Sequence, residues 1–247
     1  MAPRKVRLDQ RLLDLGLEET RSRARARILA GDVRLGERVV DKPGALVPAD
    51  AEPVLRPRRR YVSRGGEKLA GALDAFGIVP EGWRCADLGA STGGFTDCLL
   101  QRGARAVWAI DVGYGQLAHP LRGDPRVTVL ERTHVRDFRL PEGAVPFDLV
   151  TADLSFISLR SLLDPIAALA RPGGLLLLLV KPQFELRRQD VGSGGVVREP
   201  ALRERAVRQV AAVAEERGLE FLGERESVLA GPKGNRERFL LLRRPEV

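Results

Sequence analysis

One glycine-rich stretch constrains the fold of this chain more than any other, Asp87-Leu-Gly-Ala-Ser-Thr-Gly-Gly-Phe95. A short apolar run that begins at Arg84 precedes it, and an amphipathic segment with Leu99 and Leu100 on the same face as Phe95 follows it. This order predicts a strand, a tight turn and a helix. In an open α/β sheet, ligands bind beyond the carboxyl ends of the strands, where glycines and a helix N-terminus let backbone amides approach a polar group. We therefore expect a nucleoside-like ligand at this turn.

The spacing of the glycines indicates which ligand to expect. A dinucleotide fingerprint reads Gly-x-Gly-x-x-Gly, whereas this turn has Gly89, Gly93 and Gly94. A second acid, Asp111, ends the next apolar run about 20 residues after Asp87, where a carboxylate can bind both ribose hydroxyls. We predict S-adenosylmethionine; the alternative is that Asp87 only caps the turn and Asp111 is a solvated strand end. The predicted cofactor-binding residues are Asp87, Gly89, Ala90, Ser91, Thr92, Gly93, Gly94, Phe95, Asp111, Val112, His134 and Asp153.

His134 is the unusual member of this set. It follows the third predicted strand, where we expect an asparagine or aspartate to meet the adenine amino group. A neutral histidine can still accept a hydrogen bond there. The only other histidine is His119, and no cysteines or histidines have the spacing of metal ligands. We therefore predict no metal site.

The length of 247 residues suffices for one large α/β domain and a small one. Two cysteines without a pairing pattern, and an N-terminus without an apolar signal core, predict a cytoplasmic protein. The longest apolar run, residues 175–180, is far shorter than the ~18 residues of a membrane span. We expect no membrane association, and we take a monomer as the default oligomeric state.

Positive charge is concentrated at the start of the chain. Residues 1–66 hold 16 Lys and Arg against 9 Asp and Glu, while residues 67–247 hold 25 against 24. Such a partition is typical of a nucleic-acid-binding module attached to a near-neutral body, although arginine-rich codon usage is an alternative explanation. The predicted RNA-binding residues are Arg4, Lys5, Arg7, Arg21, Arg23, Arg25, Arg27, Arg34, Arg58, Arg59 and Arg60.

The basic region has the pattern of a small α+β domain. A short helix with Leu8, Leu12, Leu13 and Leu15 on one face precedes a second helix, capped by Thr20 or Ser22, in which Ala24, Ile28 and Leu29 face inward. The arginine-rich second helix and the phrase Ala30-Gly-Asp-Val-Arg-Leu35 resemble the S4 RNA-binding domain. We expect this domain over residues 1–55, a basic linker over 56–62 and a second domain over 63–247.

The second domain alternates strands and helices. We predict strands near 84–89, 106–111, 127–132, 147–153 and 174–181, with helices near 94–102, 159–170 and 199–217. Residues 219–229 and 237–242 read as a hairpin pair. This alternation predicts a doubly wound parallel sheet with an antiparallel strand late in the chain. The glycine-rich segment 183–199 reads as a mobile loop that could close over a substrate.

Three polar residues lie at the ends of apolar strands, where a substrate would meet the cofactor. Asp153 and Lys181 end two predicted strands, and Glu237 begins another. Desolvation and a neighbouring cation would lower the pKa of such a lysine. Lys68 lies in the first turn of a predicted helix, where a cation is electrostatically disfavoured and a functional role is the better explanation.

Two other methyl-transfer chemistries fit these positions poorly. Cytosine C5 methylation needs a nucleophilic cysteine, but Cys85 and Cys98 lie inside predicted elements. Methylation of an amino group usually uses an Asp/Asn-Pro-Pro-aromatic turn, and the corresponding turn here is Asp153-Leu-Ser-Phe156. Methylation of a ribose hydroxyl, a weak acid that needs a base, remains.

Five ordered motifs resemble those of the TlyA family, S4-containing relatives of FtsJ-type RNA 2′-O-methyltransferases. They are Tyr61-Val-Ser-Arg-Gly-Gly-Glu-Lys-Leu69, Asp87-Leu-Gly-Ala-Ser-Thr-Gly-Gly-Phe-Thr-Asp97, Asp153-Leu-Ser-Phe-Ile-Ser158, Lys181-Pro-Gln-Phe-Glu185 and Gly234-Asn-Arg-Glu237. The resemblance implies a Rossmann-like class I methyltransferase fold with a mostly parallel seven-stranded sheet. It also implies methylation of cytidine 2′-hydroxyls in 16S and/or 23S ribosomal RNA, with a catalytic tetrad at Lys68, Asp153, Lys181 and Glu237.

Our mechanistic hypothesis assigns the 2′-hydroxyl proton to Lys181. In it, Lys68 lowers the pKa of Lys181 and stabilises oxyanion charge, while Asp153 and Glu237 orient the two ammonium groups. The alternative function is a non-catalytic RNA-binding or membrane-active, haemolysin-like protein with a vestigial Rossmann domain. The glycine turn and the four tetrad positions favour the enzyme.

Overall fold

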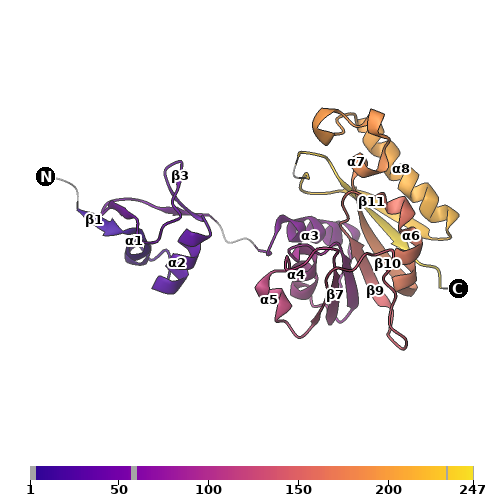
Figure 1. Ribbon diagram of the computed structural model, residues 1–247, viewed down its shortest axis with the longest axis horizontal. Coiled ribbons are helices and arrows are strands. Elements are labelled where there is room, and N and C mark those ends of the chain that lie inside the picture. Colours follow the sequence, from indigo (N-terminus) through magenta and orange to yellow (C-terminus); the bar gives the residue numbers. More distant parts are fainter. Residues whose placement is uncertain (1–3, 57–59, 232, 247) are drawn as a thin grey trace. The chain divides into compact units, whose positions relative to one another are not determined.

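The computed structural model describes residues 4–56, 60–231 and 233–246. The chain separates into two compact units, Met1–Arg59 and Arg60–Val247, each with its own core (Figure 1). The division therefore falls within the segment predicted as the linker, and Arg58 and Arg59 lie outside the described residues.

The first unit contains two helices and two small sheets. After β1 (Lys5–Arg7) come α1 (Leu8–Asp14) and α2 (Arg21–Leu29), then β2 (Val33–Leu35), β3 (Arg38–Val39), β4 (Leu46–Pro48) and β5 (Val54–Leu55). One sheet pairs β1 with β4, and the other has the order β3-β2-β5. Leu8, Leu12, Ala24 and Ile28 form the core.

Two inward-facing predictions in this unit are wrong. Leu15 is 40% exposed and Leu29 is 65% exposed. Helix α1 ends at Asp14, so Leu15 is its C-cap, and Leu29 lies one residue beyond the buried stripe of Ala24 and Ile28, about 100° around the helix. Thr20 caps α2, because its hydroxyl accepts a hydrogen bond from the amide of Arg23 at 3.3 Å.

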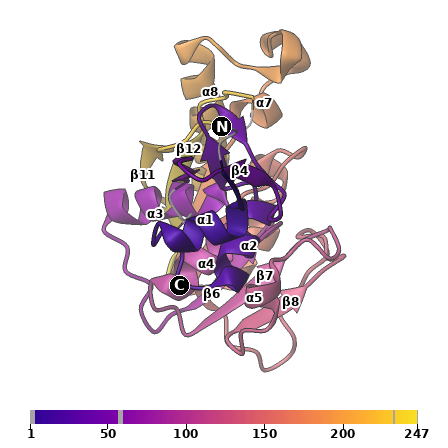
Figure 2. The ribbon, with the colours of Figure 1, turned by 90° about the vertical axis from the view of Figure 1, so that its left-hand side faces the viewer.

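The second unit is built on a seven-stranded sheet with the order β11-β12-β10-β9-β6-β7-β8. Strands β6 to β10 run parallel, and β12 is antiparallel to both β10 and β11, as predicted. Figure 2 shows β11 and β12 at one edge of this unit and β8 at the other. The strands are β6 (Arg84–Leu88), β7 (Ala106–Ile110), β8 (Val127–Leu130), β9 (Phe147–Ala152), β10 (Ala170–Val180), β11 (Glu220–Glu226) and β12 (Arg238–Arg243).

Helices cover both faces of the sheet (Figure 1). Helices α3 (Arg64–Phe76) and α4 (Gly94–Gln101) pack on one face, and α6 (Leu163–Leu169) and α8 (Pro200–Glu216) pack on the other. Successive leucines of β10 belong to the two cores in turn, with Leu177 in one and Leu176 and Leu178 in the other. This explains the continuous apolar run of β10, since a strand buried on both faces needs apolar side chains in both directions.

Several short elements were not predicted. They are α5 (His119–Arg122), α7 (Pro182–Glu185), η2 (Arg188–Asp190) and η3 (Ser193–Gly195). The predicted helix 159–170 is instead η1 (Leu159–Ser161) followed by α6, and β10 starts at Ala170 rather than near 174. Single turns of this length carry too few residues for a hydrophobic period to be detected. Within the described residues, no helix is both long and apolar enough to span a membrane.

Candidate active site

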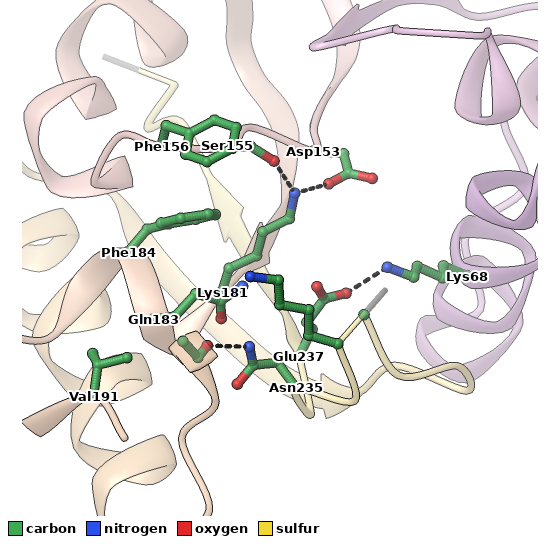
Figure 3. A pocket seen from close by; sticks show the side chains of 13 residues that line it. Lys68, Asp153, Ser155, Phe156, Lys181, Gln183, Phe184, Val191, Asn235 and Glu237 are labelled. Carbon is green, nitrogen blue, oxygen red and sulfur yellow. Dashed lines mark hydrogen bonds and ion pairs between the residues drawn. The ribbon is translucent and has the colours of Figure 1, made fainter. Parts of the chain in front are cut away.

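The sheet topology brings the four predicted tetrad residues to one edge. Asp153 follows β9 and Lys181 follows β10, so both lie at the carboxyl ends of neighbouring parallel strands. Glu237 precedes β12, whose antiparallel direction places its start at that same edge. Lys68 lies in the second turn of α3, because the helix begins at Arg64 and not near Glu67 as predicted, and its side chain points toward Glu237 (Figure 3).

The tetrad forms two ion pairs. Lys68 Nζ lies 2.5 Å from Glu237 Oε2, and Lys181 Nζ lies 2.6 Å from Asp153 Oδ1 (Figure 3). Lys68 and Glu237 are 7% and 1% exposed, so this pair is buried, and each charge needs the other in that environment. Each ammonium group thus has its own carboxylate.

A cavity of about 470 Å³ opens at these pairs. All four tetrad residues line it, together with the aromatic side chains of Phe156 and Phe184. The two rings contact each other, with centroids 5.3 Å apart. A cavity of this size, with apolar walls and a few converging charges, is typical of a site for a nucleotide-sized ligand.

A second cavity, of about 570 Å³, lies at the glycine turn. Its walls include Gly89, Ser91, Asp111, Val112 and His134, all of which the sequence predicted as cofactor-binding. Asp153, Ser155 and Phe156 line both cavities, so the two adjoin at this wall. A group held in the second cavity can therefore face one held in the first.

Asp111 is held in place by backbone amides. Its carboxylate accepts hydrogen bonds from the amide of Ser91 at 2.8 Å and from that of Gly113 at 2.6 Å. Ser91 adopts a left-handed conformation, with φ of 49°, which is uncommon for a residue other than glycine. The carboxylate retains lone pairs for further donors, as recognition of a ribose diol requires.

Asp87 connects the end of β6 to the start of α4. It is wholly buried, and its Oδ2 accepts hydrogen bonds from the amide and hydroxyl of Thr96 at 2.8 and 2.7 Å. Burial raises the pKa of this carboxyl to about 7. Asp87 does not line the second cavity and instead fixes the start of α4 to the end of β6. The position of Asp87 therefore agrees better with the alternative, in which it caps the turn, than with direct contact to a ligand.

The later residues of the turn also serve packing. A Cβ on Gly94 would lie 2.2 Å from the hydroxyl of Ser63, and a Cβ on Gly93 would lie 2.3 Å from Leu121. Phe95 is buried against Phe239, with ring centroids 6.0 Å apart. None of these residues lines the second cavity, and neither do Ala90 and Thr92.

His134 presents a donor to the second cavity. Its Nδ1 accepts a hydrogen bond from the amide of Arg136 at 3.0 Å, so a neutral imidazole carries its proton on Nε2. In this rotamer the free ring nitrogen cannot accept a hydrogen bond from an adenine amino group. His134 lines the cavity, and its predicted contact with an adenine amino group stays a prediction that would require another rotamer.

Several residues of the site were missed by the sequence reasoning. Ser155 accepts a hydrogen bond from Lys181 Nζ at 2.8 Å (Figure 3). Asn235 accepts a hydrogen bond from the amide of Val197 and donates one to the carbonyl of Gly195. Ser155 and Asn235 belong to motifs quoted from the sequence, but no spacing rule distinguishes them there. The bonds of Asn235 anchor part of the segment predicted as a mobile loop.

The predicted RNA-binding residues differ in their surroundings. Arg4, Lys5, Arg25 and Arg60 are exposed, and Arg34 is half-buried. Arg7 and Arg21 are exposed but also contact the buried carboxylate of Asp9, at 2.8 and 3.4 Å, and Arg23 pairs with Glu19. Arg27 is 12% exposed and pairs with Glu18 and Asp32, so its guanidinium supports the fold of the first unit.

Among the described residues, no group of three or more His, Cys, Asp or Glu is placed to hold a metal ion.

The parallel sheet with one antiparallel strand, and the two cavities that meet at its carboxyl edge, define a methyltransferase-type α/β protein. Residues 61–244 match the model of the FtsJ-like methyltransferase family, and residues 6–52 match that of the S4 domain. The chain belongs to the FtsJ-like methyltransferase family and carries an S4 domain. This confirms the predicted fold class and the predicted resemblance.

Three relatives cover almost the whole chain. The 16S/23S rRNA (cytidine-2′-O)-methyltransferase TlyA of Mycobacterium tuberculosis is 48% identical over 97% of this chain and 90% of its own length. Hemolysin A of Brachyspira hyodysenteriae is 38% identical over 94% of this chain and 97% of its own. A hemolysin-named structure from Streptococcus thermophilus has a TM-score of 0.74 at 39% identity, covering 99% of this chain and 90% of that chain.

Proposed function

We propose that this protein transfers a methyl group from S-adenosylmethionine to a cytidine 2′-hydroxyl of ribosomal RNA. The observation that carries the proposal is the Lys181–Asp153 pair at the wall between the two cavities. The relative that is 48% identical is named for this reaction on 16S and 23S RNA, which supports the choice of substrate.

The second cavity fits the cofactor. Asp111 offers carboxylate oxygens to a ribose diol, and Gly89 lets the chain of β6 pass close to Asp153, because a Cβ on Gly89 would lie 2.7 Å from the Asp153 carbonyl oxygen. When bound, S-adenosylmethionine supplies an electrophilic methyl group on a sulfonium, whose leaving group is a neutral thioether. The protein therefore needs mainly to position the hydroxyl and to remove its proton.

The residues of the first cavity perform these two tasks. Lys181 would accept or steer the proton of the 2′-hydroxyl whose oxygen receives the methyl group, and Asp153 holds the Nζ of Lys181 at 2.6 Å. Lys68, oriented by Glu237, adds positive charge where oxyanion character develops. The sequence-based hypothesis had Lys68 lower the pKa of Lys181. In the structure each lysine pairs with a different carboxylate, so Lys68 would act on the substrate oxygen through its charge and not through a contact with Lys181.

We further propose that the S4 domain binds ribosomal RNA. The exposed cations Arg4, Lys5 and Arg25 of the first unit support this role, since guanidinium and ammonium groups bind phosphates and A-form RNA is recognised largely by shape.

Transfer of radiolabelled methyl from S-adenosylmethionine to isolated 30S and 50S particles, followed by mapping of the modified ribose, tests the proposal. We expect label on a cytidine 2′-oxygen. Lys181→Ala should reduce transfer by about 100-fold or more, because a general base contributes about 10²- to 10⁴-fold. Binding of S-adenosylhomocysteine should persist in this variant. Full activity of Lys181→Ala would contradict the assignment.

A further inference from the structure

The segment from Asp153 to Ser158 joins β9 to η1 and contains a strained residue. Phe156 has a φ of 66°, in the left-handed region that residues other than glycine rarely adopt, and its side chain is 91% exposed. Backbone strain of this kind persists only where the surrounding structure over-determines the conformation. The contacts at the two ends of the segment show what holds it.

Glu185 holds the C-terminal end of the segment. Its carboxylate is 3% exposed and accepts hydrogen bonds from the hydroxyl of Ser158 at 2.5 Å, the amide of Leu159 at 2.7 Å and the guanidinium of Arg160 at 3.3 Å. Arg160 also donates to the carbonyl of Glu185 at 2.8 Å. The loop after β9 is thereby fastened to α7, which directly follows Lys181.

Strand pairing holds the other end. The amide of Asp153 donates to the carbonyl of Leu88 at 2.9 Å, which continues the parallel pairing of β9 with β6. Between these two attachments, Ser155 is placed with its hydroxyl oxygen 2.8 Å from Lys181 Nζ.

The hydrogen bond to Ser155 restricts the orientation of the Lys181 Nζ group. A lysine ammonium group has three donors arranged around one tetrahedral nitrogen. Two of these donors point to the Asp153 carboxylate at 2.6 Å and to the Ser155 hydroxyl at 2.8 Å (Figure 3). One tetrahedral position of Nζ is left. In the ammonium form it carries the third N–H, and in the neutral amine that the base role requires it carries the lone pair that accepts the 2′-hydroxyl proton. Without the Ser155 hydrogen bond, this position could rotate about the bond to Asp153.

We propose that Ser155 is a positioning residue, which selects the direction in which Lys181 faces the 2′-hydroxyl, and that Glu185 keeps Ser155 in place by fastening the loop. The inference rests on the proposed 2′-O-methylation. It explains why a strained, exposed loop lies at the wall shared by the two cavities. A small displacement of Ser155 there would turn Lys181 Nζ away from the 2′-hydroxyl.

The decisive experiment compares Ser155→Ala, Ser155→Thr and the exposed control Ser193→Ala in the full-length protein. Steady-state methyl transfer to the RNA substrate gives kcat and KM, and calorimetry gives the Kd of S-adenosylhomocysteine. We expect Ser155→Ala to lower kcat by about tenfold or more, since misplacing a catalytic group by about 1 Å can cost about 100-fold. KM and Kd should change little, and the threonine hydroxyl should restore most of kcat.

Unchanged kcat in Ser155→Ala would overturn the inference, and so would failure of Ser155→Thr to restore it or a parallel rise of KM and Kd. If the unaltered protein transfers no methyl group to any ribose, the proposed function itself fails. Glu185→Ala gives a readout that does not depend on activity. It removes both acceptor oxygens of the carboxylate, so hydrogen exchange at the Leu159 amide should accelerate while exchange within β10 does not change.

Discussion

At the scale of single residues, burial decides what each carboxylate does. Asp87 and Asp111 follow the same sequence rule, an acid at the end of an apolar strand. Asp87 is wholly buried and bonded to Thr96, whereas Asp111 lines the second cavity with amides behind it. The local sequence treats the two acids alike, and only their surroundings separate a structural acid from a candidate ligand-binding one.

The raised pKa of Asp87 predicts a pH dependence of stability. The folded pKa is about 7 against 3.8 for the free side chain, so between these values the folded protein holds a proton that the unfolded chain releases. Stability therefore falls as the pH rises through this window, by about 1.4 kcal/mol per unit of pKa shift. Asp87→Asn can still accept both hydrogen bonds of Thr96 without a buried charge.

Urea unfolding of the two proteins at pH 5 and pH 8 measures this effect. We expect the wild type to lose more stability than Asp87→Asn between the two pH values. An equal loss in both proteins would show that the buried carboxyl does not titrate in this range.

The two polar side chains of the cofactor cavity should contribute unequally to binding. Asp111→Ala removes a carboxylate positioned by two amides, and we expect the Kd of S-adenosylhomocysteine to rise more than about tenfold, since hydrogen bonds to charged groups contribute about 1.5–3 kcal/mol. His134→Ala removes one neutral donor and should cost less than about tenfold. Calorimetric titration of both variants decides the order, and a larger loss in His134→Ala would contradict it.

At the scale of elements, close packing of α3 on α4 places Lys68. Gly94 lets the first turns of the two helices meet, because a Cβ there would lie 2.2 Å from Ser63 Oγ and 2.8 Å from the amide nitrogen of Gly66. The sequence predicted both helices from their apolar faces. It attributed this glycine to ligand binding, because a backbone contact between two distant helices leaves no periodic signal.

Gly94→Ala should therefore disturb the tetrad from a distance. We expect a loss of about 1–3 kcal/mol in unfolding free energy from overpacking, together with reduced methyl transfer as α3 and Lys68 move away from Glu237. Gly123→Ala is a matched control, because its Cβ would have only ordinary contacts, at 3.9 Å and beyond. Denaturant unfolding and methyl-transfer assays on both variants test this, and equal stability of the two would contradict it.

At the scale of the whole molecule, the chain consists of two compact units. Each has a separate apolar core, and the excess of positive charge lies in the first 66 residues. The Lys68–Glu237 and Lys181–Asp153 pairs and both cavities belong entirely to the second unit. Binding of the cofactor should therefore be separable from binding of RNA.

Deletion of residues 1–59 tests this division. We expect the remaining unit to bind S-adenosylhomocysteine as the full chain does, because its core is intact. RNA affinity should fall, and the dependence of log K on log salt should become shallower, since every phosphate that a protein neutralises adds about 0.7–0.9 to the steepness of that slope. An unchanged salt dependence, measured by filter binding, would contradict an RNA-binding role of the first unit.

The sequence by itself determined the alternation of strands and helices, the antiparallel final strand and the four residues that meet at the sheet edge. The alternation follows from hydrophobic periodicity, and the rule that parallel strands present their carboxyl ends together brings Asp153 and Lys181 to one edge. The resemblance to the family motifs grouped Lys68 and Glu237 with them. Only the tertiary structure decided that each lysine has its own carboxylate and that Asp87 and Gly94 lie in packing contacts. It also decided that Ser155 accepts a hydrogen bond from Lys181 and that Glu185 holds the far end of the same loop. These features depend on contacts between residues far apart in the chain. Such contacts are set by three-dimensional packing and leave no pattern in the local sequence.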